Sequence, residues 1–214
     1  MRSKFDEQLR QLNNEMIEMG SMIEHAIQNA ITALFAQDVE KAEQIMKDDE
    51  LVDQAQKKIE NICFNLLIQQ QPVAKDLRTI TAAMKMVTDM ERIGDHAADL
   101  SELTIMMAGS PYLLQEDDIK HMAAEAIQML LHAIEAYVER DADKANEVIH
   151  HDDIVDEYFI KVKDELIEVI REHPERGEQA ADLLMVNKYL ERIGDHATNI
   201  AEWVIFALEE RRPN

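Results

Sequence analysis

The sequence predicts an all-α fold of two tandem antiparallel three-helix bundles related by internal duplication. Three observations lead to this prediction. Glycine and proline are scarce, at 5 and 4 of 214 residues, whereas turn-rich β sandwiches and barrels need more of both. Apolar residues recur at helical spacing over long stretches of the chain. Two separate segments also recur about 100 residues downstream. Two copies of a repeat of this length are too few and too long for a solenoid.

The recurring segments define two copies of one unit. Residues 91–97 read Glu-Arg-Ile-Gly-Asp-His-Ala, and the same seven residues stand at 191–197, an offset of 100. Residues 38–53 resemble residues 141–156 at an offset of 103. The difference between the two offsets places a few extra residues between the segments. The duplication therefore covers most of the chain.

Breaks in the helical pattern divide each copy into three helices. Pro72 and Pro174 interrupt the pattern at matching places, and Asp38 is a plausible helix cap. A Gly/Ser/Pro cluster at 108–111 separates the copies, so we expect two domains, 1–109 and 110–214. The predicted helices are a first that ends at Ala36, then 38–70, 74–108, 116–140, 142–172 and 175–210.

The composition excludes several classes of function. The net charge of −22 makes the chain a poor ligand for nucleic acid or for a membrane through a polybasic patch. Its single cysteine, Cys63, has no partner for an internal disulfide and lies in an apolar run. No apolar run approaches the roughly 18 residues of a membrane span, and no secretory signal is visible. We therefore expect a cytoplasmic protein.

Acidic residues spaced four apart are the strongest candidates for function. On a helix, such residues lie about 40° apart and project from one face. Asp99 and, in the second copy, Asn199 continue the same stripe as the later pairs. The four pairs are Asp49 with Asp53, Glu91 with Asp95, Asp152 with Asp156, and Glu191 with Asp195.

These pairs need a positive charge. Like charges at this spacing cost roughly 0.2–0.5 kcal/mol per pair, and about half of the acids have no Lys or Arg three or four residues away. Carboxylates favour hard cations such as Mg²⁺, Ca²⁺, Mn²⁺ or iron. The alternative is an ordinary solvated acidic face, but both kinds of pair recur in both copies. If the second and third helices of each copy are adjacent, four carboxylates meet there.

Two glycines lie inside the predicted helices beside the acids. Gly94 and Gly194 cost roughly 1 kcal/mol each relative to alanine, yet both copies contain them. We therefore expect two helices to approach each other closely at these points. His96 and His196 point about 140° away from the first acid of their motifs, which predicts a role in helix packing or in supporting the metal ligands rather than direct metal ligation.

The tandem Glu-Arg-Ile-Gly-Asp-His motifs resemble the PhoU family of phosphate-uptake regulators. The two Asp-x-x-x-Asp pairs and the segment 71–78, Gln-Pro-Val-Ala-Lys-Asp-Leu-Arg, resemble it too. The resemblance implies two three-helix bundles that carry multinuclear clusters of iron, zinc, manganese or magnesium. It assigns no second copy to Arg78, so any role of this residue is one-sided. The metal ligands that it implies are Asp49, Asp53, Glu91, Asp95 and Asp99 in the first copy, and Asp152, Asp156, Glu191 and Asp195 in the second. Asn199 replaces the last acid in the second copy, so the clusters are expected to differ.

The resemblance also implies a function. It predicts a cytoplasmic, dimeric accessory protein that restrains the high-affinity phosphate ABC transporter and the phosphate-starvation response. The implied partners are the ATPase subunit of the transporter and a sensor histidine kinase, so that contact with the membrane is indirect. We expect binding rather than catalysis, because the sequence contains no phosphate-binding glycine loop and no recognisable nucleophile. The alternatives are a carboxylate-bridged metalloenzyme acting on phosphate compounds and a metal-free acidic adaptor.

Overall fold

The computed structural model describes residues 2–70, 72–109 and 116–209. These residues form six α-helices and one 3₁₀ turn, with no strand among them, which confirms the all-α prediction. The elements are α1 (Arg2–Ala36), α2 (Val39–Gln70), α3 (Ala74–Met107), α4 (Glu116–Glu139), α5 (Ala142–Glu172), η1 (Pro174–Arg176) and α6 (Gly177–Leu208).

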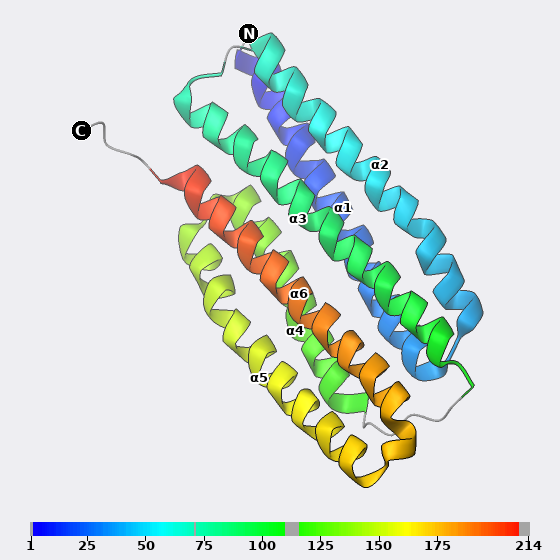
Figure 1. Cartoon of the computed structure of the whole chain (residues 1–214). Coiled ribbons are helices and arrows are strands. Elements are labelled where there is room, and N and C mark those ends of the chain that lie inside the picture. The colour runs from blue at the N-terminus through cyan, green and yellow to red at the C-terminus, as the bar shows by residue number, and fades with distance from the viewer. Residues whose placement is uncertain (1, 71, 110–115, 210–214) are drawn as a thin grey trace.

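The helices form two three-helix bundles that lie side by side (Figure 1). Helices α1, α2 and α3 pack on one another, and α4, α5 and α6 do the same. The bundles meet through α3 and α6, which run in opposite directions along the middle of the molecule, and through α1 and α4. The arrangement is the predicted tandem pair of bundles. None of the described helices is long and apolar enough to cross a membrane.

The predicted helix ends lie within two residues of the observed ones. The last helix was expected to begin at residue 175, but α6 begins at Gly177 because Pro174–Arg176 form a separate 3₁₀ turn. The domain boundary predicted between residues 109 and 110 adjoins the segment 110–115 in the sequence. That segment is outside the described part of the chain.

The turn between the first two helices is the same in both copies. Gln37 and Arg140, at an offset of 103 residues, have positive φ angles of 54° and 60°. Each is followed by an aspartate that caps the next helix. The Asp38 carboxylate accepts a hydrogen bond from the Lys41 amide at 3.0 Å, and Asp141 accepts one from the Lys144 amide at 3.0 Å. The predicted Asp38 cap is confirmed, and the duplication extends to backbone conformation.

The glycine of each repeated motif lies where two helices touch. A Cβ atom on Gly94 would lie 2.9 Å from Cγ1 of Val52 on α2, closer than packed carbon atoms approach. A Cβ atom on Gly194 would lie 3.2 Å from Cγ1 of Val155 on α5. The predicted close approach is confirmed in both bundles. The missing side chain lets α3 pack tightly on α2, and α6 on α5.

We expect Gly94→Leu and Gly194→Leu each to lower the free energy of unfolding by about 1–3 kcal/mol, because the added side chain overpacks a tight contact. The measurement is thermal unfolding followed by circular dichroism. Gly177→Ala is the matched control, because no atom lies within 4 Å of its added Cβ. That substitution should leave the melting temperature unchanged or raise it. Leucine variants that melt like the wild type would contradict the packing interpretation.

Candidate functional site

The first bundle brings four of the predicted carboxylates together. The first carboxylate cluster consists of Asp49 and Asp53 on α2 and Glu91 and Asp95 on α3. A Cβ atom on Gly94 would lie only 3.6 Å from the Asp49 carboxylate, so the tight helix contact is also what places the acids opposite each other. The charges of Asp53 and Asp95 raise the pKa values of both Asp49 and Glu91, so the acids of the two helices lie close together.

The second bundle repeats the arrangement. The second carboxylate cluster consists of Asp152 and Asp156 on α5 and Glu191 and Asp195 on α6. A Cβ atom on Gly194 would lie 3.2 Å from the Asp152 carboxylate. Asp195 on α6 lies near enough to Asp152 and Asp156 on α5 for their charges to interact, so this bundle also brings acids together across two helices.

Burial and mutual repulsion disfavour the charged form of these acids. Burial, followed by the charges of Asp95, Asp53 and Asp99, raises the pKa of Asp49 to about 6. Burial, followed by the charges of Asp156 and Asp195, raises the pKa of Asp152 to about 6. The pKa values of Glu91 and Asp195 are raised for the same reasons. The positive charge around each cluster is therefore too small to balance its carboxylates.

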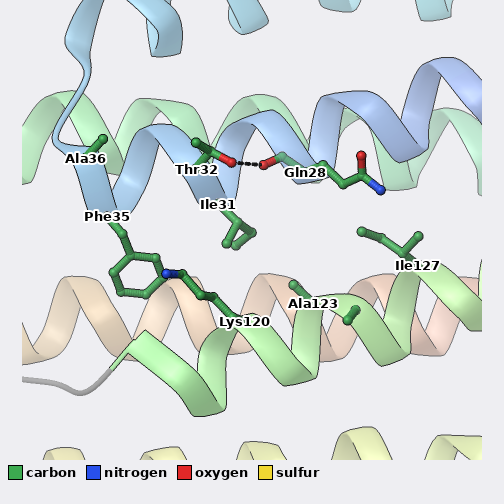
Figure 2. A pocket seen from close by; sticks show the side chains of 9 residues that line it. Gln28, Ile31, Thr32, Phe35, Ala36, Lys120, Ala123 and Ile127 are labelled. Carbon is green, nitrogen blue, oxygen red and sulfur yellow. Dashed lines mark hydrogen bonds between the residues drawn. The ribbon is translucent and has the colours of Figure 1, made fainter.

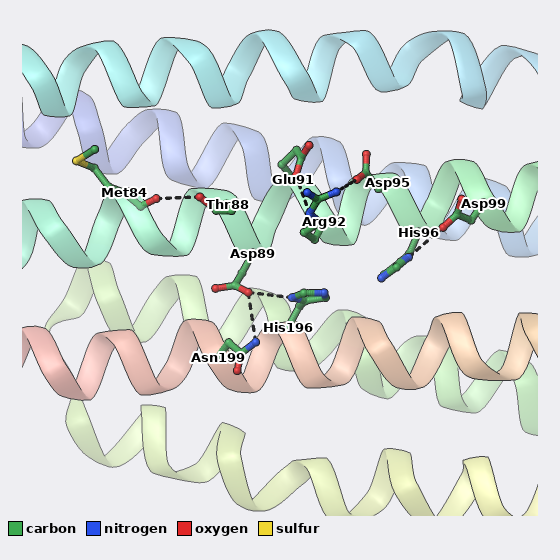
Figure 3. Close-up of polar contacts among 10 residues, drawn as sticks. All are labelled: Met84, Thr88, Asp89, Glu91, Arg92, Asp95, His96, Asp99, His196 and Asn199. Atoms are coloured by element: carbon green, nitrogen blue, oxygen red, sulfur yellow. Dashed lines mark hydrogen bonds and ion pairs between the residues drawn. The ribbon is translucent and has the colours of Figure 1, made fainter.

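Basic side chains partly neutralise both clusters, and in the first the Lys57 ammonium lies 3.8 Å from the Asp53 carboxylate. The Arg92 guanidinium lies 2.9 Å from the Asp95 carboxylate and 3.6 Å from that of Glu91 (Figure 3). In the second cluster the Lys188 ammonium pairs with Glu191. A search for basic residues three or four positions away does not find the partner of Glu91, because Arg92 is the next residue along the chain.

The donor chemistry of the clusters suits a hard cation, but the donors have not converged. Carboxylate oxygens are ligands for Mg²⁺, Mn²⁺ and iron. Within the part of the chain that the structure describes, no three His, Cys, Asp or Glu side chains come close enough to hold a metal ion as they stand. A bound ion would therefore require the carboxylates to turn toward one another and away from Arg92 or Lys188.

The remaining two residues of the acidic stripe have different surroundings. The Asp99 carboxylate is 3.1 Å from Nδ1 of His96, and its charge also reaches Asp49. The Asn199 amide donates a hydrogen bond of 3.3 Å to Asp89 on α3. Asp99 therefore borders the first cluster, whereas Asn199 contributes to the contact between α3 and α6 (Figure 3).

The motif histidines meet at this contact, as predicted for a packing role. The rings of His96 and His196 have centroids 5.7 Å apart, and His96 is only 7% exposed. Nδ1 of His196 lies 2.8 Å from the Asp89 carboxylate, and the His96 ring stacks on Tyr189 at 5.3 Å. We name these four residues the histidine seam.

Sequence reasoning missed two members of the histidine seam. Asp89 and Tyr189 occupy equivalent positions of the two copies, at an offset of 100 residues, but differ in chemistry. A search for repeated motifs cannot find a position at which the copies disagree. Their partners also lie on the other bundle, so no spacing along one helix reveals them.

Arg78 connects the two bundles and lies away from the carboxylate clusters. Its Nε donates a hydrogen bond of 3.0 Å to the backbone carbonyl of Phe206, and its guanidinium lies 4.3 Å from the centre of the Phe206 ring. The Glu209 carboxylate lies 3.8 Å away. Arg78 therefore neutralises the carbonyl end of α6 and attaches it to α3. Glu178, the equivalent residue, cannot do this, so the role is one-sided, as expected.

Comparison with known proteins identifies the family. The PhoU domain model matches residues 16–104 and 119–204. The phosphate-specific transport system accessory protein PhoU homolog of Clostridium acetobutylicum is 40% identical over 97% of this chain and 95% of its own length. A protein of the same description from a Burkholderia species is 32% identical over 97% of this chain and 89% of its own length.

Solved structures agree with these relatives. The crystal structure of PhoU from Pseudomonas aeruginosa has a TM-score of 0.89 at 31% identity and covers 95% of this chain and 98% of that one. The phosphate transport system regulatory protein PhoU from Streptococcus pneumoniae has a TM-score of 0.87 at 28% identity and covers 95% of this chain and 96% of that one. The duplicated bundles and the whole-length similarity together place this chain in the PhoU family.

Proposed function

We propose that this chain is a regulator of phosphate uptake that restrains a high-affinity phosphate ABC transporter and phosphate-starvation signalling when phosphate is plentiful. The observation that carries the proposal is the match to PhoU proteins over both copies of the duplicated unit. Those relatives are named as accessory or regulatory proteins of phosphate transport, which supports a role in binding rather than catalysis.

We propose that the two carboxylate clusters bind metal ions. Two features support this: each cluster gathers four oxygen-donor side chains, and repulsion and burial leave each cluster in need of positive charge. Iron, manganese, magnesium and zinc are the candidate ions, and the all-carboxylate donor set favours the first three. Bound ions would supply positive charge to a negative helix surface. Without metal, the side chains of Arg92 and Lys188 supply this positive charge. They would turn outward when a metal ion binds.

The carboxylates of the clusters are partly or fully exposed, so they are available to partner proteins. An acidic surface attracts a basic patch, and partial neutralisation by metal would weaken that attraction. We propose that the ATPase subunit of the transporter and the sensor histidine kinase are the partners, and that the chain acts as a homodimer in the cytoplasm. In this mechanism the metal occupancy of the clusters sets the charge of the surface that the partners contact. The protein transfers no chemical group.

A metal-free acidic adaptor is the second candidate. It is favoured by the ion pairs of Arg92 and Lys188, which already neutralise part of each cluster. It is also favoured by the lack of three converged donors among the described residues. In that case the acids would serve only as docking charges.

The raised pKa values predict how stability depends on pH. Asp49 and Asp152 keep their protons to about pH 6 in the folded chain, against 3.8 for an ordinary aspartate. The folded state therefore binds protons that the unfolded chain has released, and stability falls as the pH rises from about 4 to about 6. Because the side chains are half exposed, we expect a loss of only about 1 kcal/mol for each residue.

Asp49→Asn and Asp152→Asn should therefore raise the free energy of unfolding of chelator-treated protein by about 1 kcal/mol each at about pH 8, and by almost nothing at about pH 4. Urea unfolding at the two pH values measures this difference. Asp164→Asn, at an exposed position farther along α5, is the control and should change little. A destabilised Asn variant at the higher pH would show that the carboxylate charges are already compensated.

Metal binding is tested by elemental analysis of untagged protein purified without chelator. We expect several iron or other divalent ions per chain in the wild type and their loss in the double variant Asp95→Asn, Asp195→Asn. Added ions should raise the melting temperature of the wild type alone, by an amount equivalent to about 2.7 kcal/mol at 100 times the dissociation constant. A metal-free wild type that ignores both chelator and added ions would leave the adaptor as the function of the clusters.

The regulatory role is tested in a bacterium that lacks its own PhoU protein. Expression of this chain should restore low uptake of labelled phosphate in phosphate-rich medium. The double variant Asp95→Lys, Asp195→Lys should fail to do so and should recover less of the transporter ATPase subunit in pull-downs, while its circular dichroism stays unchanged. Unaltered uptake with the wild-type chain would contradict the regulatory function, and unaltered pull-down by the variant would exclude the clusters as the docking surface.

A further inference from the structure

A narrow pocket of about 190 Å³ opens beside the first carboxylate cluster, where α1, α2 and α3 meet. It is bounded by Met22 on α1, Asp49 on α2 and Gly94 on α3, and we name it the Gly94 pocket. Its volume lies below the roughly 300–1,000 Å³ that is typical of small-molecule sites. The pocket therefore suits a single side chain of another protein better than a free metabolite.

Asp49 brings an uncompensated negative charge to the Gly94 pocket. Among the described residues its carboxylate makes no ion pair and no hydrogen bond, and the charges of neighbouring acids repel it. Asp48, which also lines the pocket, is bound only by the neutral amide of Gln44, at 2.8 Å. Both carboxylates therefore favour a cation as the occupant.

The other polar side chains of the pocket can accept hydrogen bonds. Nδ1 of His25 lies 2.6 Å from the backbone carbonyl oxygen of Ser21, which can only accept, so Nδ1 carries a proton. In the neutral ring Nε2 is then an acceptor, and no described residue bonds to it. The amide of Asn29, also without a partner among the described residues, can present its carbonyl oxygen. A cation that donates several hydrogen bonds fits this lining.

The spacing of the acceptors distinguishes between cations. No three His, Cys, Asp or Glu side chains of the described chain come close enough together to hold a metal ion as they stand. A guanidinium carries five N–H donors on a planar frame, so it can reach separate acceptors, whereas an ammonium is a compact point charge. Met22 and Leu51, which are 37% and 48% exposed, offer apolar walls to the methylene stem of an arginine.

The second bundle fills the equivalent space with its own side chains. Where the pocket has Ala26, the second bundle has the larger Met129. Where the pocket has Asp48, the second bundle has His151, and Nε2 of this histidine lies 2.6 Å from the Glu125 carboxylate. The second cluster thus has a basic side chain of the same chain beside it, at the place where the first has an open pocket.

A larger groove between α1 and α4, of about 600 Å³, does not offer an unpartnered charge (Figure 2). Of the described residues that line this groove, Lys120 alone is charged, and its ammonium already lies 5.2 Å from the centre of the Phe35 ring. Ile31 and Ala123 on the groove walls are buried in the core. The free carboxylate of Asp49 is what distinguishes the Gly94 pocket.

We propose that the Gly94 pocket receives one arginine side chain of a partner protein, with the guanidinium on Asp49 and the methylene stem against Met22 and Leu51. The inference rests on the docking of partners at the carboxylate clusters proposed above, and it names the residue type that the partner presents. A guanidinium can pair with a carboxylate through two hydrogen bonds, which fixes orientation as well as charge. A metal ion that used Asp49 as a ligand would exclude the arginine.

The test is NMR titration of the full chelator-treated chain with n-butylguanidinium, in about 0.15 M salt to screen diffuse attraction. With ¹³C-labelled methionine methyl groups, the Met22 resonance should shift and saturate, whereas that of Met185, exposed on α6, should not shift. n-Butylurea, which has the same shape and no charge, should bind about tenfold more weakly or less. Equal binding of n-butylurea, or tighter binding of n-butylammonium, would overturn the proposal.

Two variants test the position of the site. Asp49→Asn should weaken binding about tenfold, the weight of one charge-assisted hydrogen bond, whereas Glu50→Gln, at an exposed neighbour outside the pocket, should not. Ala26→Met should fill the pocket and abolish the Met22 shift, and Ala181→Met, at an exposed position of α6, is its matched control. Circular dichroism verifies that each variant is folded. Undiminished binding by either folded pocket variant would overturn the proposal.

The outcome is separable from that of the proposed function. If the wild-type chain restores low phosphate uptake but n-butylguanidinium leaves the Met22 resonance unchanged, the arginine pocket is refuted and the regulatory function stands. If n-butylguanidinium binds as expected but uptake is unaltered, the pocket stands and the regulatory function is refuted.

Discussion

The close approach of helices at the two motif glycines is the constraint on which the candidate site depends. At Gly94 the missing Cβ atom leaves room for the side chains of Val52 and Asp49, and the same holds at Gly194 for Val155 and Asp152. A larger residue would separate α2 from α3 and α5 from α6. The acids on each helix would then face solvent instead of the acids of the neighbouring helix, and their charges would affect each other far less.

Helices α3 and α6 each present different chemistry on two sides. Asp95 and His96 are consecutive, and consecutive residues on a helix point about 100° apart. The carboxylate therefore reaches its cluster while the imidazole reaches the other bundle. Each cluster is thus one residue away from the contact that holds the bundles together. A movement of the Asp95 carboxylate can therefore reach the histidine seam through the backbone of one neighbouring residue.

Much of the fold could be predicted from the sequence because its signals are local and repeated. Helical periodicity, proline breaks, the Asp38 cap and the recurring motif all act within a few residues or between identical segments. The pairing of the acids followed once α2 and α3 were assumed to be neighbours. The contacts across the bundles could not be predicted in this way. Asp89 and Arg78 find their partners more than 100 residues away, and nothing near either residue in the sequence indicates those partners.

The histidine seam has a consequence for the history of the chain. Two separate copies of one repeat, assembled about a twofold axis, would have to present the same residue on both sides of that axis. In this chain His196 meets an aspartate where His96 meets a tyrosine. Covalent fusion removes the obligation to be symmetric, since each half then has a single fixed partner. At the seam the two halves are therefore complementary to each other and not to themselves.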